Sequence, residues 1–315
     1  MAVNVNDLFT NLLYRLRSCP EQESRNGRVR SMGQPILFTT INPKQRVLFN
    51  PLRKCNPYLH VMETVWMFAG ENSVEFLLPF SKQMEAYAEP DGVINGAYGH
   101  RWRSYFGRDQ IMGVINELAR DPDSRQAVIG MYDPAQDWKQ QWNDRPCNTH
   151  IYFRKYGGAL DMTVCNRSND VVWGACGANI VHMTYLQELV ATALKCPVGS
   201  YNVMSNNLHI YEHHYNLLNN PQSYDYYHDK LDVNPLPLLG ANESDVYELL
   251  NECEAFVRNG PEGTYKSSWI NGVVIPMYQH YMCRLNGDKD TYDTSETLAT
   301  DWRLAENLWR EWNDN

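Results

Sequence analysis

The sequence lacks three features: a run of about 18 apolar residues, a Cys-X-X-Cys pair and a strongly basic segment. Without a long apolar run we expect no membrane-spanning helix, and without close Cys or His spacing we expect no metal site. With 37 acidic against 28 basic residues, a net charge of −9, the chain offers no clustered positive surface. A nucleic-acid polymer is therefore not an expected partner.

The N-terminal segment MAVNVNDLFTNLLYRL also lacks a basic leader. The eight cysteines stand singly, which is typical of free thiols in a reducing compartment. We therefore expect a cytoplasmic protein.

What is present is an apolar content of 43% in 315 residues, sufficient for a large core. The periodicity predicts helices over 7–17, 58–69, 179–195, 244–258 and 295–312, a hairpin over 149–167 and a strand over 198–211. The last helix carries Trp302, Trp309 and Trp312, a stripe typical of packing or of a dimer contact. No repeat or linker divides the chain, so we expect one mixed α/β domain over 1–315.

Three polar clusters interrupt these elements: SRNGRVRS at 24–31, DPDSRQAV at 121–128 and NRSNDVVWG at 166–174. A single cluster of this kind is more often a solvated loop that happens to contain arginine. Arginine forks and a serine hydroxyl together suit a phosphate dianion, because charge-assisted bonds fix its orientation. The clusters therefore suggest a phosphate clamp.

Cys147 lies in RPCNTH, after a proline and just before the predicted hairpin. A free cysteine is usually a small buried hydrophobe. Here nearby arginines, Arg145 among them, are expected to favour the thiolate, which makes Cys147 a candidate nucleophile.

Eight segments resemble, in order and spacing, the thymidylate synthase and pyrimidine-nucleotide hydroxymethylase family. They are SRNGRVRSMGQ, METVWMFAGENS, YGHRW, DSRQAVI, RPC, NRSNDVVWG, GAN and LHIYEHH, between about residues 25 and 211. The resemblance implies an α/β fold with a large mixed sheet flanked by helices, paired sheet to sheet in a homodimer. It also implies that Arg125 reaches the partner's site and that a divergent helical region occupies about 240–315.

The resemblance assigns the chemistry as follows. Cys147 adds to C6 of a pyrimidine nucleoside monophosphate, so that C5 attacks the methylene of 5,10-methylenetetrahydrofolate. Glu63 acts as general acid and base, Tyr98 assists deprotonation of C5, and Asp170 is a further catalytic residue.

It also assigns the binding residues. The phosphate ligands are Arg25, Arg125, Arg167 and Ser168, with Arg28 or Arg30 as substitutes for Arg25. The sugar residues are His209 and Tyr211, the base residue is Asn179, and the folate residues are Asp170, Gly174 and Met84.

The chain departs from the synthase pattern at several positions. Gln126 replaces an arginine, Asn148 a histidine and Met84 a tryptophan, and one extra residue stands between Asp170 and Asn179. The C-terminal NLWREWNDN shows no apolar closing tail. Met84 and the missing tail predict a site that excludes water less well, and so a hydroxymethylase that releases tetrahydrofolate. A thymidylate synthase and a catalytically silent RNA-binding relative are the alternatives.

The base is left open by the amide of Asn179, which can complement either uracil or cytosine by flipping. The run VVWGACGANIVH is closer to the cytidylate hydroxymethylases, so the sequence favours dCMP. CMP and dUMP remain open.

Overall fold

The computed structural model describes residues 1–138, 141–230, 232–240, 245–288 and 293–314. Its larger sheet has the strand order β3-β8-β6-β5-β4 and its smaller sheet the order β1-β2-β9-β7. The strands are β1 Glu21–Ser24, β2 Gly27–Ser31, β3 Ile36–Thr40, β4 Val128–Gly130, β5 Asn148–Tyr156, β6 Ala159–Asn166, β7 Asn169–Asp170, β8 Val198–Ser205 and β9 Leu208–Tyr211. Both sheets are mixed, because β6–β8 and β7–β9 pair in parallel and the other pairs antiparallel. The larger sheet, with helices beside it, fits the expected α/β fold, and the smaller mixed sheet adds to it.

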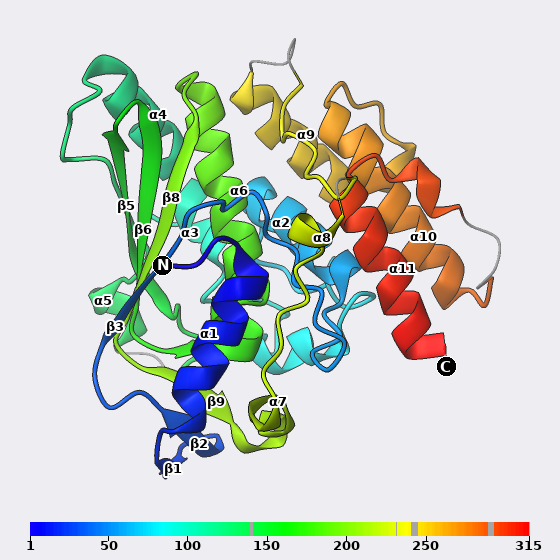
Figure 1. Cartoon of the computed structure of the whole chain (residues 1–315). Helices are drawn as coiled ribbons and strands as arrows, with labels where there is room; N and C mark the ends of the chain where they lie inside the picture. Colours follow the sequence, from blue (N-terminus) through cyan, green and yellow to red (C-terminus); the bar gives the residue numbers. More distant parts are fainter. Residues whose placement is uncertain (139–140, 231, 241–244, 289–292, 315) are drawn as a thin grey trace.

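Helices lie mainly on one side of the larger sheet (Figure 1). The α-helices are α1 Val5–Arg17, α2 Pro57–Ala69, α3 Tyr98–Arg103, α4 Gln110–Arg120, α5 Pro134–Asp137, α6 Ala178–Ala193, α7 Asn216–Asn219, α8 Tyr226–Asp229, α9 Val246–Asn259, α10 Ile275–Leu285 and α11 Thr300–Asp314. Shorter helical turns are η1 Lys82–Tyr87, η2 Val171–Ala175, η3 Glu212–His214, η4 Gly260–Glu262, η5 Ile270–Val274 and η6 Thr294–Glu296. Among the described helices none is both long and apolar enough to cross a membrane.

Helix α2 is buried along its whole length, as its continuous apolar pattern predicts. The Asn56 side chain caps its first turn, and Gly70 ends it with a φ of 74°. Helices α6, α9, α10 and α11 pack around it. Glu63 is a charged residue within this buried helix, a position that a carboxylate rarely occupies unless it has a function or a partner.

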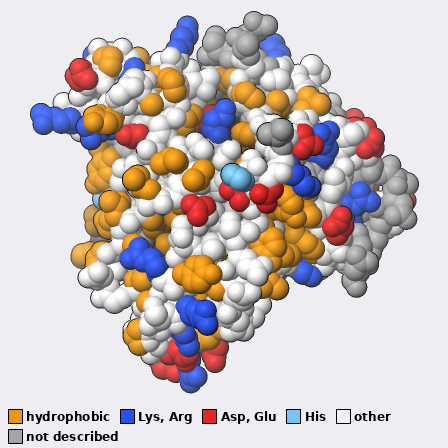
Figure 2. All heavy atoms as spheres, in the orientation of Figure 1, with side chains coloured by type: hydrophobic (Ala, Val, Ile, Leu, Met, Phe, Trp, Pro, Cys, Tyr) orange, Lys and Arg blue, Asp and Glu red, His pale blue; other side chains and the backbone are white. Residues whose placement is uncertain are grey.

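The predicted hairpin is confirmed as β5 and β6, joined by Gly157 and Gly158 at φ values of 58° and 85°. One face of the larger sheet packs on the core, whereas the other leaves Leu37, Val128, Tyr152 and Met204 exposed. Figure 2 shows hydrophobic side chains along the left edge of the molecule, where Figure 1 places this sheet. None of the described helices covers that face (Figure 1).

The prediction of one strand over 198–211 is wrong. The chain leaves the larger sheet after Ser205 and enters the smaller one at Leu208, so two strands replace one. Backbone bonds hold the crossing: Asn206 donates to Asn166 and Asn169 donates to Asn207. The crossing places β9 beside β7.

The C-terminal helices follow the predictions with shifted ends. Helix α9 covers 246–259, and the predicted start at residue 244 lies outside the described residues. Helix α11 begins at residue 300 rather than at the predicted 295, because the short turn η6 precedes it. Trp302 is buried and donates to the Tyr185 hydroxyl at 2.8 Å. Trp309 meets the Tyr58 ring edge-on at 5.4 Å. These two tryptophans therefore serve packing within the chain.

Candidate active site

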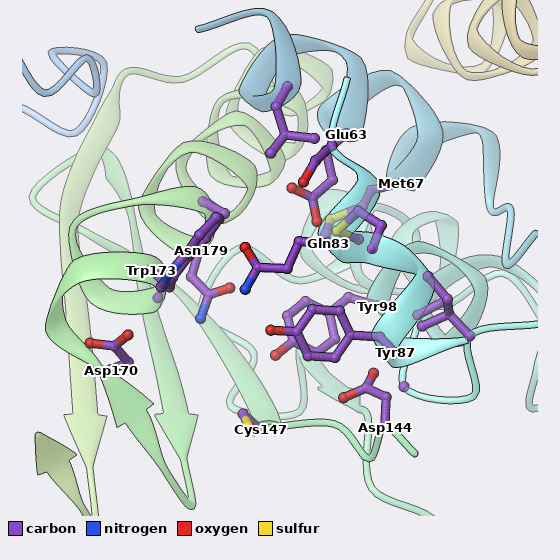
Figure 3. Close-up of a pocket in the computed structure, with 18 of the residues that line it drawn as sticks. Glu63, Met67, Gln83, Tyr87, Tyr98, Asp144, Cys147, Asp170, Trp173 and Asn179 are labelled. Atoms are coloured by element: carbon purple, nitrogen blue, oxygen red, sulfur yellow. The ribbon is translucent and has the colours of Figure 1, made fainter. Parts of the chain in front are cut away.

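A pocket of about 230 Å³ opens between α2, η1, the start of α6 and the segment before β5 (Figure 3). Eight residues assigned from the sequence line it: Glu63, Met84, Tyr98, Cys147, Ser168, Asp170, Gly174 and Asn179. The structure thus brings the predicted nucleophile, acid and base-binding residue together.

Cys147 immediately precedes β5, and its carbonyl accepts a bond from the Arg167 backbone at 2.9 Å. Burial raises the pKa of the Cys147 thiol, the Arg167 guanidinium opposes this, and Asp144 adds to it. Burial outweighs the effect expected of nearby arginines, and the arginine that favours the thiolate is Arg167. Arg145 contributes its backbone carbonyl, which accepts from Arg167 Nη2 at 2.9 Å and helps to hold that guanidinium near Cys147.

Glu63 projects from buried α2 into the pocket (Figure 3). Burial raises the pKa of its carboxyl to about 8. The neighbouring His182 lies 3.4 Å away through Nε2, and burial keeps the pKa of that imidazole well below its ordinary range. Glu63 is therefore a neutral acid at pH 7, with a proton to donate.

Replacing Glu63 with glutamine should change how stability depends on pH. The folded protein keeps the Glu63 proton up to about pH 8, whereas the unfolded chain loses it near 4.5, so stability falls as pH rises between these values. Glutamine removes this loss. Relative to the wild type, the free energy of unfolding of Glu63→Gln should rise by up to about 1.4 kcal/mol per pH unit. Urea unfolding of both proteins at pH 5.5 and 7.5 measures this, and a difference that does not change with pH would contradict it.

Tyr98 begins α3 and lies half-buried beside the nucleophile. Burial raises the pKa of its phenol well above the ordinary value, and hydrogen bonding from the Asn148 and Cys147 backbone opposes this only in part. Tyr98 therefore remains a protonated phenol next to the reacting atoms.

The extra residue between Asp170 and Asn179 is accommodated in η2, a turn of π-helix. Insertion of one residue is what such a turn absorbs. Asp170 caps it by accepting from the Val172 N–H at 3.0 Å. A Cβ on Gly174 would lie 2.3 Å from Asn169 Oδ1 and 3.1 Å from Asn179 Nδ2, so only glycine fits there. Asn179 still faces the pocket, despite the insertion.

His209 and Tyr211 lie outside the pocket lining, on neighbouring β9. His209 pairs in register with Asp170, and burial lowers the pKa of its imidazole while the Asp170 carboxylate opposes this. The His209 ring meets Tyr211 edge-on at 5.0 Å, and its Nδ1 lies 2.9 Å from Asn207 Oδ1. These contacts place the predicted sugar residues beside the predicted folate carboxylate.

The predicted phosphate arginines are dispersed in the single chain. Arg25 lies at the exposed turn between β1 and β2, and Arg125 is exposed just before β4; neither lines the pocket. The substitutes are engaged elsewhere, since Arg28 and Arg30 both form ion pairs with Glu21. Of the predicted phosphate ligands, Arg167 lies near Cys147 and Ser168 lines the pocket.

Several lining residues were not identified from the sequence. They are Leu59, Trp66, Met67, Ser81, Gln83, Tyr87, Ile94, Gly96, Ala97, Asp144, Asn169, Trp173 and Ala178. Of these residues, Asp144 could have been identified from the sequence, because a carboxylate three residues before a candidate nucleophile is itself a candidate catalytic residue. Across the described residues, no three His, Cys, Asp or Glu side chains are grouped to hold a metal ion.

Comparison with known proteins identifies the family of the chain. The family model described as thymidylate synthase matches residues 24–234. A deoxyuridylate hydroxymethyltransferase of Pseudomonas phage M6 is 35% identical, over 98% of this chain and 92% of its own length. Proteins of the same name from Bacillus phage SP01 and Delftia phage PhiW-14 are 33% and 30% identical, over 82% and 61% of this chain and 67% and 56% of their own lengths.

Proposed function

The chain belongs to the thymidylate synthase family, in its hydroxymethylase branch, and from this premise we propose the reaction of this one-carbon transferase. It converts a pyrimidine nucleoside monophosphate and 5,10-methylenetetrahydrofolate into the 5-hydroxymethyl nucleotide and tetrahydrofolate. The observation that carries the proposal is the pairing, in one pocket, of the Cys147 thiol with a Glu63 carboxyl that burial keeps protonated.

Each residue has a defined task in this proposal. Cys147 adds to C6, and the charge that develops on the ring is met by the proton of Glu63. Tyr98, fixed by the backbone N–H groups of Cys147 and Asn148, orients water toward the proton on C5. Arg167 and Ser168 hold the phosphate beside the nucleophile, and His209 and Tyr211 hold the sugar.

The Trp173 indole forms an aromatic wall of the pocket, and the folate is proposed to bind against it. The Arg53 guanidinium lies 4.8 Å from the centroid of that ring, and Arg53 Nε donates to the Val172 carbonyl at 3.1 Å, so the indole is clamped. Tyr87 and Met84 line the pocket as well, which suits a flat ring system. The folate supplies the one-carbon unit, and Asp170 and Gly174 contact it.

The names of the relatives favour uracil as the base of the nucleotide. The sequence alone favours dCMP, but three relatives are named deoxyuridylate hydroxymethyltransferases. The Asn179 amide accepts either base by flipping, so dUMP fits the site equally well.

The exposed face of the larger sheet supports a homodimer. Leu37, Val128, Tyr152 and Met204 form an apolar patch on strands that no described helix covers. A second copy paired there would bury the patch, and Arg125, just before β4, would reach the partner's pocket. We treat residues 1–315 as one catalytic domain of a cytoplasmic enzyme.

The products distinguish this reaction from that of a synthase. The protein should be incubated with 5,10-methylenetetrahydrofolate and each of dUMP, dCMP, UMP and CMP, with products identified by mass. We expect 5-hydroxymethyl-dUMP without dihydrofolate, because no hydride leaves the carrier. Stoichiometric dihydrofolate with a 5-methyl product would identify a thymidylate synthase. No product and no ternary complex with any nucleotide would indicate the silent relative.

A further inference from the structure

A second carboxyl lies in the pocket at Asp144, on the segment that leads to Cys147. In Figure 3 it lies near Cys147 and below the rings of Tyr87 and Tyr98, while Glu63 lies on the far side of those rings. Gly96 makes room for it: a Cβ at position 96 would lie 2.1 Å from Asp144 Oδ2. The lack of a side chain at Gly96 therefore leaves the space that the Asp144 carboxyl group occupies near Cys147.

The two carboxyls have different surroundings. Burial alone accounts for the raised pKa of Glu63. Burial also raises the pKa of Asp144, and Asp137 adds to this, whereas Arg167, Arg101 and the Arg145 backbone N–H act in the opposite direction without cancelling the rise. Two titratable groups whose surroundings differ in this way divide the roles of acid and base between them. Burial is the only cause acting on the pKa of Glu63, whereas Asp144 is the carboxyl placed among positive groups, where it can accept a proton.

Hydroxymethylation needs such a base at its last step. Once the one-carbon unit is attached, C5 carries an exocyclic methylene and C6 is still bonded to Cys147 sulfur. A water oxygen bonds to the methylene carbon, and the displaced electron pair moves into the ring. That pair then re-forms the C5–C6 double bond and expels the Cys147 thiolate. The water must lose one proton, and a group in the pocket must take it.

We propose that Asp144 positions this water and accepts its proton; the proposal rests on the hydroxymethylase function proposed above. The other nearby groups are poorly suited. Glu63 lies on the far side of the Tyr87 and Tyr98 rings (Figure 3) and already serves the charge on the pyrimidine ring, and burial raises the pKa values of both phenols. Asp170 is engaged in capping η2.

The test is Asp144→Asn, which keeps the shape and removes the base. With enzyme in excess, release of tritium from C5 of labelled nucleotide reports the steps up to the methylene. It should stay within about threefold of the wild type. Formation of the 5-hydroxymethyl product should fall about 100-fold. Added 2-mercaptoethanol should then trap the methylene as a thioether, seen by mass.

The matched control is Glu85→Gln, which changes an exposed carboxyl on η1 outside the pocket lining and should leave both rates unchanged. If Asp144→Asn fails to fold, Asp144→Ala replaces it, and added formate should restore part of its hydroxymethyl product. Equal product with and without formate would contradict the role. So would an Asp144→Asn protein in which tritium release and product fall by the same factor, or in which neither falls. A wild type that makes 5-methyl product and dihydrofolate would overturn the proposed function instead, and the same assay shows this separately.

Discussion

Cys147→Ala is expected to lower turnover by about 10⁵-fold while nucleotide binding stays within a few fold of the wild type. The loss is large because, without the sulfur at C6, C5 is not a nucleophile and no later step can begin. Binding persists because the predicted phosphate and sugar residues, among them Arg167 and His209, do not depend on the thiol. Product formation by mass and nucleotide affinity by calorimetry measure the two effects.

The matched control is Cys283→Ala, which removes a free, partly buried thiol from the end of α10, outside the pocket. It should leave turnover unchanged. Substantial hydroxymethyl product from Cys147→Ala would show that the reaction does not pass through a covalent adduct at this residue.

Mixing two inactive variants, Arg125→Ala and Cys147→Ala, should restore about a quarter of wild-type activity. The proposed dimer builds each pocket from Cys147 of one chain and Arg125 of the other. After exchange of equal amounts, half of the dimers are mixed, and each of these has one intact pocket out of two. Activity per chain, measured against time of mixing, follows the exchange.

The control mixture combines Cys147→Ala with Glu63→Ala. Both residues line the pocket of the same chain, so no mixed dimer regains an intact site and no activity should return. If subunit exchange is demonstrated by mass and the Arg125→Ala mixture stays inactive, Arg125 does not act across the interface.

The parts of the fold that are set by local pattern could be predicted from the sequence. Helix α2 carries its own cap and its terminal glycine, and the β5–β6 hairpin carries its Gly157-Gly158 turn. The division of 198–211 into two strands could not be predicted, because the partners of β8 and β9 are β3, β6, β2 and β7, all distant in sequence.

The site divides in the same way. Cys147, Glu63 and Asn179 were found from ordered motifs, whereas the protonation of Cys147 and Glu63 depends on burial that only the packed chain supplies. The thiol shows this most clearly. The sequence places Arg145 beside Cys147, but the folded chain directs the guanidinium of Arg167 to it, across the turn from β6. Proximity along the chain was therefore a poor guide to electrostatic proximity.

The π turn at Val171–Ala175 has a consequence for how such a pocket can evolve. An added residue within a regular α-helix rotates everything that follows by about 100°, which would turn Asn179 out of the pocket. A widened turn confines the addition to five residues, so that α6 keeps its orientation and Asn179 its position. A single inserted codon can thus remodel the wall around Trp173 in one mutational step, without a compensating change elsewhere. Deleting one residue from Val171–Ala175 would be the corresponding reverse step.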